Sequence, residues 1–413
     1  MTKRMILLAA LMGLGLLPGA VLAQPKNSCL ECHRGLEAEL KAPAETFAQD
    51  IHQQFGLTCK DCHGGNPAQD DVDKAKDKTF KGAPKRALIP EFCARCHSDT
   101  AYMRQFNPNL RVDQLSQYVT SKHGQRLKAG DTKAAVCTDC HGVHGIQTAK
   151  YPKSMTFPWN IPQTCARCHS DAAYMKPYGI PTDQMAKYKE SVHAAALFDK
   201  KDMSAPTCNS CHGNHGAVPP EVKSIGSVCR QCHPSNGELF AKSPHKKAFD
   251  DMGQSECEAC HGNHKIERPT TAMLGTSDKS VCLQCHDKGS QGYAAAGELR
   301  ALLDGFEKRV AANTATLELA EKKGVEVSDP VFKLKDVNTV LVSAKNLVHG
   351  LSLAEIRKKL GEGDQTLADV EKAGAAALDE AKFRRKGLII ATILLALFGV
   401  ALFFKIRSMR KAD

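Results

Sequence analysis

The motif Cys-x-x-Cys-His occurs nine times in this chain of 413 residues and uses all 18 of its cysteines. The motifs lie between residues 29 and 286, which leaves roughly one motif per 29 residues. So little chain cannot build a side-chain core around each motif, so whatever the motifs bind has to form much of the core. The motifs are Cys29-Cys32-His33, Cys59-Cys62-His63, Cys93-Cys96-His97, Cys137-Cys140-His141, Cys165-Cys168-His169, Cys208-Cys211-His212, Cys229-Cys232-His233, Cys257-Cys260-His261 and Cys282-Cys285-His286.

The spacing of these motifs is that of covalent haem attachment. Two thiols separated by two residues can be linked to the vinyl groups of one haem, and the adjacent histidine supplies an axial nitrogen to its iron. A lone Cys-x-x-Cys pair is more often a zinc or redox motif. Here a histidine follows all nine pairs, although only 17 of the 413 residues are histidine. We therefore predict nine covalently bound haem c groups, numbered 1 to 9 in chain order, with the motif histidines as proximal ligands.

Eight histidines lie outside the motifs, and their positions repeat. Four stand between two motifs, and three of these end a Ser-x-His sequence: His52, His123, His193 and His245. Three more lie three residues after a proximal histidine, at His144, His215 and His264. A histidine that close cannot reach the opposite face of the same haem, so each would bind a neighbouring iron. We predict that all seven are distal ligands.

His349 is the eighth, 63 residues after His286, and we expect it to ligate the ninth haem from a helix that packs back over the haems. Eight histidines cannot serve nine irons. The gap falls in the first module, where His63-Gly-Gly-Asn66 replaces the later His-Gly-x-His. Haem 2 lacks a histidine if the inter-motif histidines serve the preceding haem, and haem 1 lacks one if they serve the following haem. The remaining iron could take a methionine, a lysine, a residue of a partner, or no ligand.

An internal repeat organises the motifs. The segment from Cys93 to Met103 recurs almost unchanged from Cys165 to Met175, and a more divergent copy begins at Cys229. The sequence thus predicts four two-haem modules and a ninth haem within a domain covering residues 24–290. We expect a mainly α fold with a haem-packed core and little regular structure.

The N-terminus has the pattern of a secretory signal peptide over residues 1–23. Lys3 and Arg4 precede an apolar run that is too short to span a bilayer. The run is followed by residues of the kind that signal peptidase recognises, and we expect cleavage after Ala23. An uncleaved N-terminal anchor is the alternative. Because haem attachment of this kind takes place outside the bacterial cytoplasm, an exported chain fits the motifs.

Near the other end, Leu388 to Phe404 is an apolar run without a charge. At about 1.5 Å per residue this run covers roughly 25 Å, and basic residues on both sides can extend it by snorkelling. We predict a transmembrane helix over residues 387–405 and a cytoplasmic tail over residues 406–413. The body of the chain would then lie on the periplasmic face of the membrane.

Between the haem domain and this span, residues 291–386 form a predicted helical region. Leu299, Leu303 and Phe306 begin an apolar pattern with helical spacing. A break is expected near Gly324, followed by a second helix from residue 331 to 349. A capping box at Ser352–Glu355 predicts a third helix, and a final helix from about Gln365 should continue into the membrane.

The net charge of +11 would ordinarily suggest an acidic partner. Each haem, however, carries two propionates that this count omits, so much of the basic charge can pair with them. Nucleic-acid binding is therefore not predicted.

The Ser-x-His and Cys-x-x-Cys-His-Gly-x-His units, followed by a helical region with one more histidine, resemble the multihaem cytochrome c superfamily. They are similar to the lineage of octahaem tetrathionate reductase, hydroxylamine oxidoreductase and cytochrome c554. Enzymes of that lineage have a catalytic haem, in some marked by a lysine-containing motif, and this chain has no Cys-x-x-Cys-Lys. The resemblance therefore implies haem packing and electron transfer more than catalysis.

An iron with two histidine ligands can pass electrons but cannot bind a substrate. We expect a membrane-anchored cytochrome that conducts electrons between the quinol pool, or a quinol-oxidising membrane subunit, and periplasmic redox proteins. The alternative is a reductase of a nitrogen or sulfur oxyanion at the haem without a distal histidine. A weaker alternative is assembly into haem filaments, which the anchor disfavours.

Overall fold

The computed structural model describes residues 27–219 and 222–409. The predicted signal peptide and residues 410–413 of the predicted tail lie outside the described residues. α-Helices, short 3-10 turns and a π-helical turn at Ala195–Asp199 account for the regular structure of the described part, which contains no strand. The predicted mainly α fold is confirmed. The chain divides into two compact units, one formed by the chain up to Cys165 with Asn214–Ala217 and the other by the remainder.

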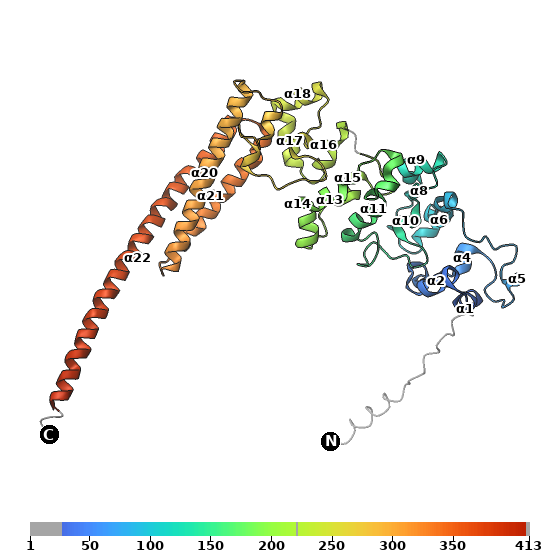
Figure 1. Ribbon diagram of the computed structural model, residues 1–413, viewed down its shortest axis with the longest axis horizontal. Coiled ribbons are helices and arrows are strands. Elements are labelled where there is room, and N and C mark those ends of the chain that lie inside the picture. Colours follow the sequence, from blue (N-terminus) through green and yellow to red (C-terminus); the bar gives the residue numbers. More distant parts are fainter. Residues whose placement is uncertain (1–26, 220–221, 410–413) are drawn as a thin grey trace, which may run out of the picture. The chain divides into compact units, whose positions relative to one another are not determined.

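The first unit is built from short helices joined by irregular segments (Figure 1). The helices that carry haem motifs are five to nine residues long, and their core is sparse, with Met103, Ala134 and Val136 among the few buried apolar side chains. Its elements are α1 (Ser28–Arg34), α2 (Ala38–Thr46), η1 (Phe47–Gln49), α3 (Ile51–Gln54), α4 (Cys59–His63), α5 (Val72–Ala75), η2 (Arg86–Leu88), α6 (Ile89–His97), α7 (Thr100–Arg104), α8 (Gln114–Thr120), α9 (Lys122–Lys128), α10 (Cys137–His141) and η3 (Pro158–Asn160).

The second unit begins in the same style and ends in long helices. Helix α11 (Ile161–His169) carries the fifth motif across the boundary between the units. The elements that follow are α12 (Ala172–Met175), η4 (Lys176–Tyr178), α13 (Gln184–Lys189), α14 (Val192–Ala194), η5 (Ala195–Asp199), α15 (Cys208–His212), α16 (Val222–Arg230), α17 (Pro234–Lys242), α18 (Pro244–Met252), α19 (Glu258–His261), η6 (Thr271–Met273), η7 (Val281–Gln284), α20 (Gln291–Lys322), α21 (Ser328–Leu347), η8 (Val348–Gly350) and α22 (Leu353–Met409).

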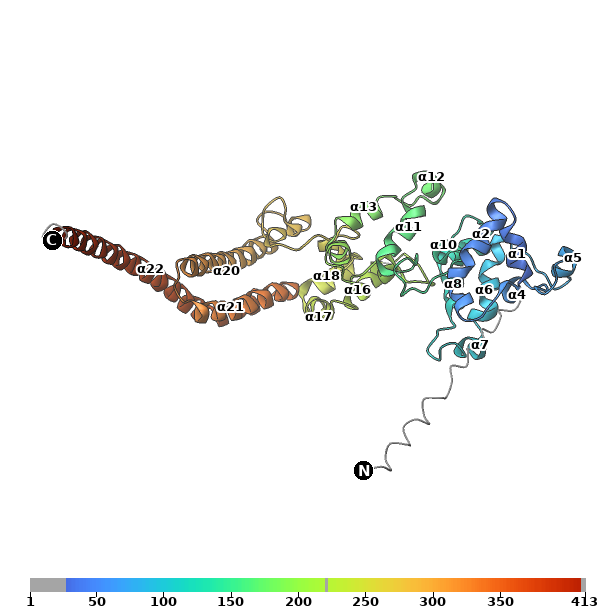
Figure 2. The same ribbon diagram turned by 90° about the horizontal axis from the view of Figure 1, so that it is seen from below.

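Helices α20, α21 and the first half of α22 form a bundle with a continuous apolar core (Figures 1 and 2). The helical spacing expected from the sequence gives buried side chains at Leu299, Leu303 and Phe306. Each of these helices buries one apolar stripe against the other two, which is the packing expected of amphipathic helices. The bundle is the part of the chain with a conventional side-chain core.

The third and fourth helices expected near the C-terminus are one helix, α22, of 57 residues. The sequence suggested a separate final helix from about Gln365, but α22 contains no proline and its buried positions continue through this stretch. A Cβ at Gly363 would lie 3.1 Å from Phe306 and 3.2 Å from Val340. The glycine therefore allows close helix packing and does not end the helix.

The C-terminal end of α22 carries the apolar run expected to cross a membrane. An 18-residue window reaches a mean hydropathy of 2.7, and none of it is buried. The side chains from Phe383 onward in the described part are exposed, whereas Ala381 is the last buried one. An exposed apolar segment of this length supports a single membrane anchor.

Candidate haem-iron sites

Several haem motifs are each held on one short helical turn that ends abruptly. Helices α4, α10 and α15 begin at the first cysteine of a motif and end at its histidine. The next residue is a glycine with positive φ, at Gly64 (φ 72°) and Gly142 (φ 82°) among others. At Gly64 a Cβ would lie 2.0 Å from the carbonyl oxygen of Thr79, so only glycine fits there. The turn brings two thiols and an imidazole together within five residues.

Seven pairs are seen in the described part of the chain in which a proximal histidine faces a histidine from outside the motifs. Their ring centroids lie between 5.7 and 6.5 Å apart. The pairs are His97 with His52 (5.9 Å), His63 with His144 (5.9 Å), His141 with His215 (6.1 Å), His212 with His264 (6.0 Å), His233 with His193 (6.5 Å), His261 with His349 (6.1 Å) and His286 with His245 (5.7 Å).

This spacing fits a haem iron between two imidazoles. With metal–nitrogen bonds of about 2.0 Å, and about 1.1 Å from a ring nitrogen to its centroid, two rings on opposite sides of one metal have centroids about 6.2 Å apart. The seven observed distances fall around that value. Direct stacking of two rings would bring their centroids closer together. The rings are therefore held apart by the distance that a ligated iron requires.

Hydrogen bonds orient several of these rings. The Nδ1 atom of His33 donates to the carbonyl oxygen of Leu40 (2.8 Å), and that of His63 donates to Gly82 (2.9 Å). In the same way the Nδ1 atom of His349 donates to Asn346 (2.9 Å). Because a carbonyl can only accept, Nδ1 carries the proton and Nε2 keeps its lone pair for a metal.

Burial favours the neutral form of the imidazoles. It is the main cause that lowers the pKa of His141 and His97, and the neighbouring histidines lower the pKa further. The same holds for His144, His193, His245, His261 and His264. Because only the neutral imidazole binds a metal, these surroundings suit ligation.

A repeated backbone hydrogen bond brings the outer histidines to their places. The first residue of an inter-motif helix donates its N–H to a carbonyl two residues beyond a Gly-x-His of the next module. These bonds join Ile51 to Ile146 (2.8 Å), Lys122 to Ala217 (3.0 Å) and Val192 to Ile266 (2.8 Å). We call this bond the module clamp. Each clamp fixes two outer histidines at once, one from each of the joined segments.

The fourth module differs, because its inter-motif helix α18 begins with Pro244, which has no N–H to donate. No Gly-x-His follows this module along the chain. Its second histidine comes from the helical region, where His349 lies in η8 next to α17. In the fourth module, the N–H that would donate to a module clamp is therefore absent, and so is the Gly-x-His segment whose carbonyl would accept it.

The serines of two Ser-x-His sequences, Ser121 and Ser191, cap the helix that follows. The Ser191 hydroxyl accepts the N–H of Ala194 (3.1 Å) and donates to the carbonyl of Tyr188 (2.6 Å). The Tyr188 hydroxyl in turn donates to Pro206 (2.9 Å), close to the next motif. Tyr118 makes the matching bond to Ala135 (2.8 Å). These contacts anchor the inter-motif helix to the segment that leads into the following motif.

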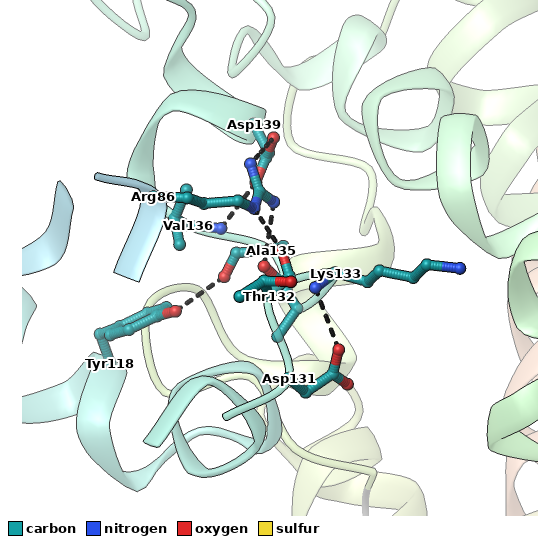
Figure 3. A network of polar contacts seen from close by, with 9 residues as sticks. Arg86, Tyr118, Asp131, Thr132, Lys133, Ala135, Val136 and Asp139 are labelled. Atoms are coloured by element: carbon teal, nitrogen blue, oxygen red, sulfur yellow. Dashed lines mark hydrogen bonds and ion pairs between the residues drawn. The ribbon is translucent and has the colours of Figure 1, made fainter. Parts of the chain in front are cut away.

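Figure 3 shows how the fourth motif is fixed. The guanidinium of Arg86 makes two bonds to the carboxylate of Asp139, at 2.6 and 3.2 Å. It also donates to the carbonyls of Thr132 (2.6 Å) and Ala134 (3.0 Å). Asp139 also accepts the N–H of Val136 (2.7 Å), which caps α10. Sequence reasoning missed Arg86, and no motif marks it.

The module pairing differs in part from the sequence-based expectations. Inter-motif histidines face the first haem of the following module, and Gly-x-His histidines face the second haem of the preceding one. His349 faces His261 of haem 8, not haem 9 as expected, because α18 places His245 against His286. The alternatives for the first module took His52 as a ligand of haem 1 or haem 2, whereas its ring faces that of His97, the proximal histidine predicted for haem 3. In the described part of the chain, no histidine ring faces His33.

The attachment cysteines of consecutive motifs lie next to each other within each unit. Cys93 and Cys137 are within hydrogen-bond reach, and Cys229 and Cys257 are likewise. Between modules, burial and then Cys96 raise the pKa of Cys62, and burial and then Cys282 raise that of Cys260. Haems attached at these positions would be direct neighbours.

Comparisons with known proteins agree with this chemistry. The family model described as Cytochrome c3 matches residues 51–170, and the model of a doubled CXXCH motif matches residues 250–291. No curated protein and no solved structure matches the chain significantly. The two matches support a multihaem c-type cytochrome with covalently bound haem c, and they imply electron transfer.

Proposed function

We propose that this chain is a membrane-anchored periplasmic cytochrome that binds nine haem c groups and conducts electrons between the quinol pool, or a membrane partner, and periplasmic acceptors. The observation that carries the proposal is the set of seven facing histidine pairs with centroids 5.7 to 6.5 Å apart. Bound haem c would supply a one-electron redox centre at each pair. The two histidines of a pair would occupy both axial positions and so exclude other ligands.

The proposed ligands are the 18 motif cysteines for covalent attachment and the nine motif histidines on the proximal side. On the distal side we propose His52, His144, His193, His215, His245, His264 and His349, in the pairs given above. His123 is proposed as a distal ligand as well, because Ser121 caps α9 as Ser191 caps α14.

The order of the attachment sites supports conduction along the chain. Cys62 lies near Cys96, and Cys93 lies against Cys137, so haems 2, 3 and 4 would follow one another within the first unit. In the second unit Cys229 lies against Cys257, and Cys260 lies near Cys282. Short steps between neighbouring haems are what a conductor requires.

The anchor supports the proposed location. Helix α22 would hold the haem domain beside the membrane, where a quinol-oxidising subunit could donate electrons. The predicted signal peptide and the need for haem attachment outside the cytoplasm support the periplasmic side.

His144→Ala in the holoprotein tests the proposed pairing. We expect one haem, haem 2, to change from low to high spin and to bind carbon monoxide, because His63 would lose its opposite ligand. The matched control is Val143→Ala, which changes the exposed neighbouring residue and should alter neither spin state nor carbon monoxide binding. An unchanged spectrum in His144→Ala, with nine haems present, would contradict the proposal.

One observation favours a second candidate function, the reduction of a nitrogen or sulfur oxyanion at haem 1. The ring of His33 is oriented by Leu40, but no histidine of the described residues faces it. An iron there could keep an open position for a small ligand. We expect the native protein to bind nitric oxide or carbon monoxide at one of nine haems, and nitrite or tetrathionate to shift a high-spin signal. A fully low-spin spectrum that does not change when these ligands are added would exclude this function.

A further inference from the structure

Asp50 stands where the later modules have a serine, two residues before an inter-motif histidine. The matching residues are Ser121, Ser191 and Ser243. The hydroxyls of all three donate to a backbone carbonyl three residues earlier, and those of Ser121 and Ser191 also accept a backbone N–H three residues later. Asp50 also caps its helix, because its side chain accepts the N–H of His52, but it does so with a carboxylate in place of a hydroxyl.

The carboxylate of Asp50 is 2% exposed and uses both of its oxygens. Oδ1 accepts the backbone N–H of His52 (2.9 Å) and lies 2.8 Å from its Nδ1. Oδ2 accepts the N–H of Ile146 (2.9 Å), next to the module clamp. Because both oxygens accept backbone N–H groups, the carboxylate acts as an acceptor toward the ring as well, and Nδ1 of His52 carries the proton.

The ring of His52 is also oriented differently from those of the serine modules. Its plane makes an angle of 83° with that of His97. In the modules with serine, the angle is 32° between His193 and His233 and 26° between His245 and His286. The pair next to the carboxylate is therefore nearly perpendicular, and the two pairs next to a serine are closer to parallel.

We propose that Asp50 is a positioning residue that holds the ring of His52 perpendicular to that of His97 and so gives haem 3 an electronic structure different from that of the serine modules. The inference rests on the proposed function, because it takes His52 and His97 as axial ligands. A ring tied at Nδ1 to a buried carboxylate, which is tied in turn to Ile146, cannot turn freely. Second-shell carboxylates of this kind fix the orientation of a ligating histidine and raise its basicity.

The relative orientation of two axial imidazoles has a spectroscopic signature. Perpendicular rings give oxidised low-spin iron a highly anisotropic EPR signal with a large gmax, whereas near-parallel rings give a rhombic signal. We expect Asp50→Ser, which restores the residue of the later modules, to remove one haem equivalent from the anisotropic signal and add one to the rhombic signal. The variant should keep nine haems and the spin states of the unmodified protein. The matched control is Ser191→Ala in the third module, which should leave the anisotropic signal unchanged.

A second variant separates charge from orientation. Asp50→Asn keeps an oxygen that can accept from Nδ1, so the anisotropic signal should remain. It removes a buried negative charge beside the iron, so the reduction potential of one haem should shift to a more positive value in an EPR-monitored titration. If Asp50→Ser does not assemble nine haems, Asp50→Asn decides, and loss of the anisotropic signal in this variant would overturn the proposal.

His52→Ala distinguishes this proposal from the one on which it rests. If His52→Ala does not increase the number of high-spin haems, His52 is not a ligand and the proposed function fails at haem 3. If it converts one haem to high spin while Asp50→Ser leaves the anisotropic signal intact, the ligand assignment stands and the positioning role of Asp50 is overturned.

Discussion

At the scale of single residues, the first position of an inter-motif helix determines whether a module clamp can form. Val192 donates its N–H to Ile266, whereas Pro244 at the matching position has no N–H. The preceding residues have almost the same backbone, with ψ 158° at Ser191 and ψ 157° at Ser243. Proline is tolerated at the first turn of a helix after an extended residue. One backbone hydrogen bond can therefore be removed there without distorting the chain.

We expect Val192→Pro to assemble nine haems with unchanged spin states but to unfold more easily. The loss of one buried backbone hydrogen bond costs about 1 kcal/mol. His264, which adopts a left-handed φ of 39°, should also be held less firmly, because Ile266 would lose its bond. Denaturant unfolding measures the first effect, and the rate at which carbon monoxide displaces a ligand measures the second.

The control is Ala172→Pro, at the exposed first position of α12, where the preceding Asp171 is also extended. It introduces the same residue type at the same helix position without touching a clamp. Equal destabilisation in both variants would show that proline itself, and not the clamp, is responsible.

At the scale of elements, the bundle of α20, α21 and α22 delivers a histidine to the haem domain of its own unit. Leu351, with a φ of 52°, ends η8 in a left-handed conformation between α21 and α22. This turn places His349 against His261, and the apolar core of the bundle fixes the turn. The bundle therefore acts as the distal support of haem 8 and also leads into the anchor.

The assignment of His349 to haem 8 can be tested in a chain without the ninth haem. In Cys282→Ser/Cys285→Ser, eight haems should remain by pyridine haemochromogen assay. We expect His349→Ala in this background to add one carbon monoxide-binding haem, because haem 8 loses its ligand. If His349 served haem 9, as the sequence suggested, the substitution would add none.

The sequence predicted the local features well, because they depend on neighbours along the chain. The motif turns, the helices that begin near Gln291 and Ser328, and the stop at Gly350 all follow from short-range patterns. The pairing of histidines did not, because it depends on clamps between segments about 70 to 95 residues apart, such as Ile51 with Ile146. The role of Asp50 was not predicted for a related reason. The contact between its carboxylate and the ring of His52 explains why an acid replaces the serine, and the sequence does not show this contact.

At the scale of the whole molecule, the described part of the chain has two kinds of core. The bundle is held by side chains such as Leu303 and Ile356, which are fully buried. The modules have few buried apolar residues, so the haems themselves would supply most of their core. We expect the modules to depend on haem attachment for folding, as metal-dependent domains depend on their metal. The bundle should form without it.

The same division predicts what removal of the anchor does. The last buried residue of α22 is Ala381, so a chain that ends at Arg385 keeps the whole core of the bundle. We expect this truncated protein to be released into the periplasmic fraction with nine haems and an unchanged low-spin spectrum. The full-length chain should stay in the membrane through high-salt and alkaline washes, because about 17 apolar residues in a helix insert into the hydrocarbon region. Protease added to spheroplasts should digest its haem domain. Release of the full-length chain by salt alone, or loss of haems on truncation, would show that α22 contributes to the haem domain and does not act only as an anchor.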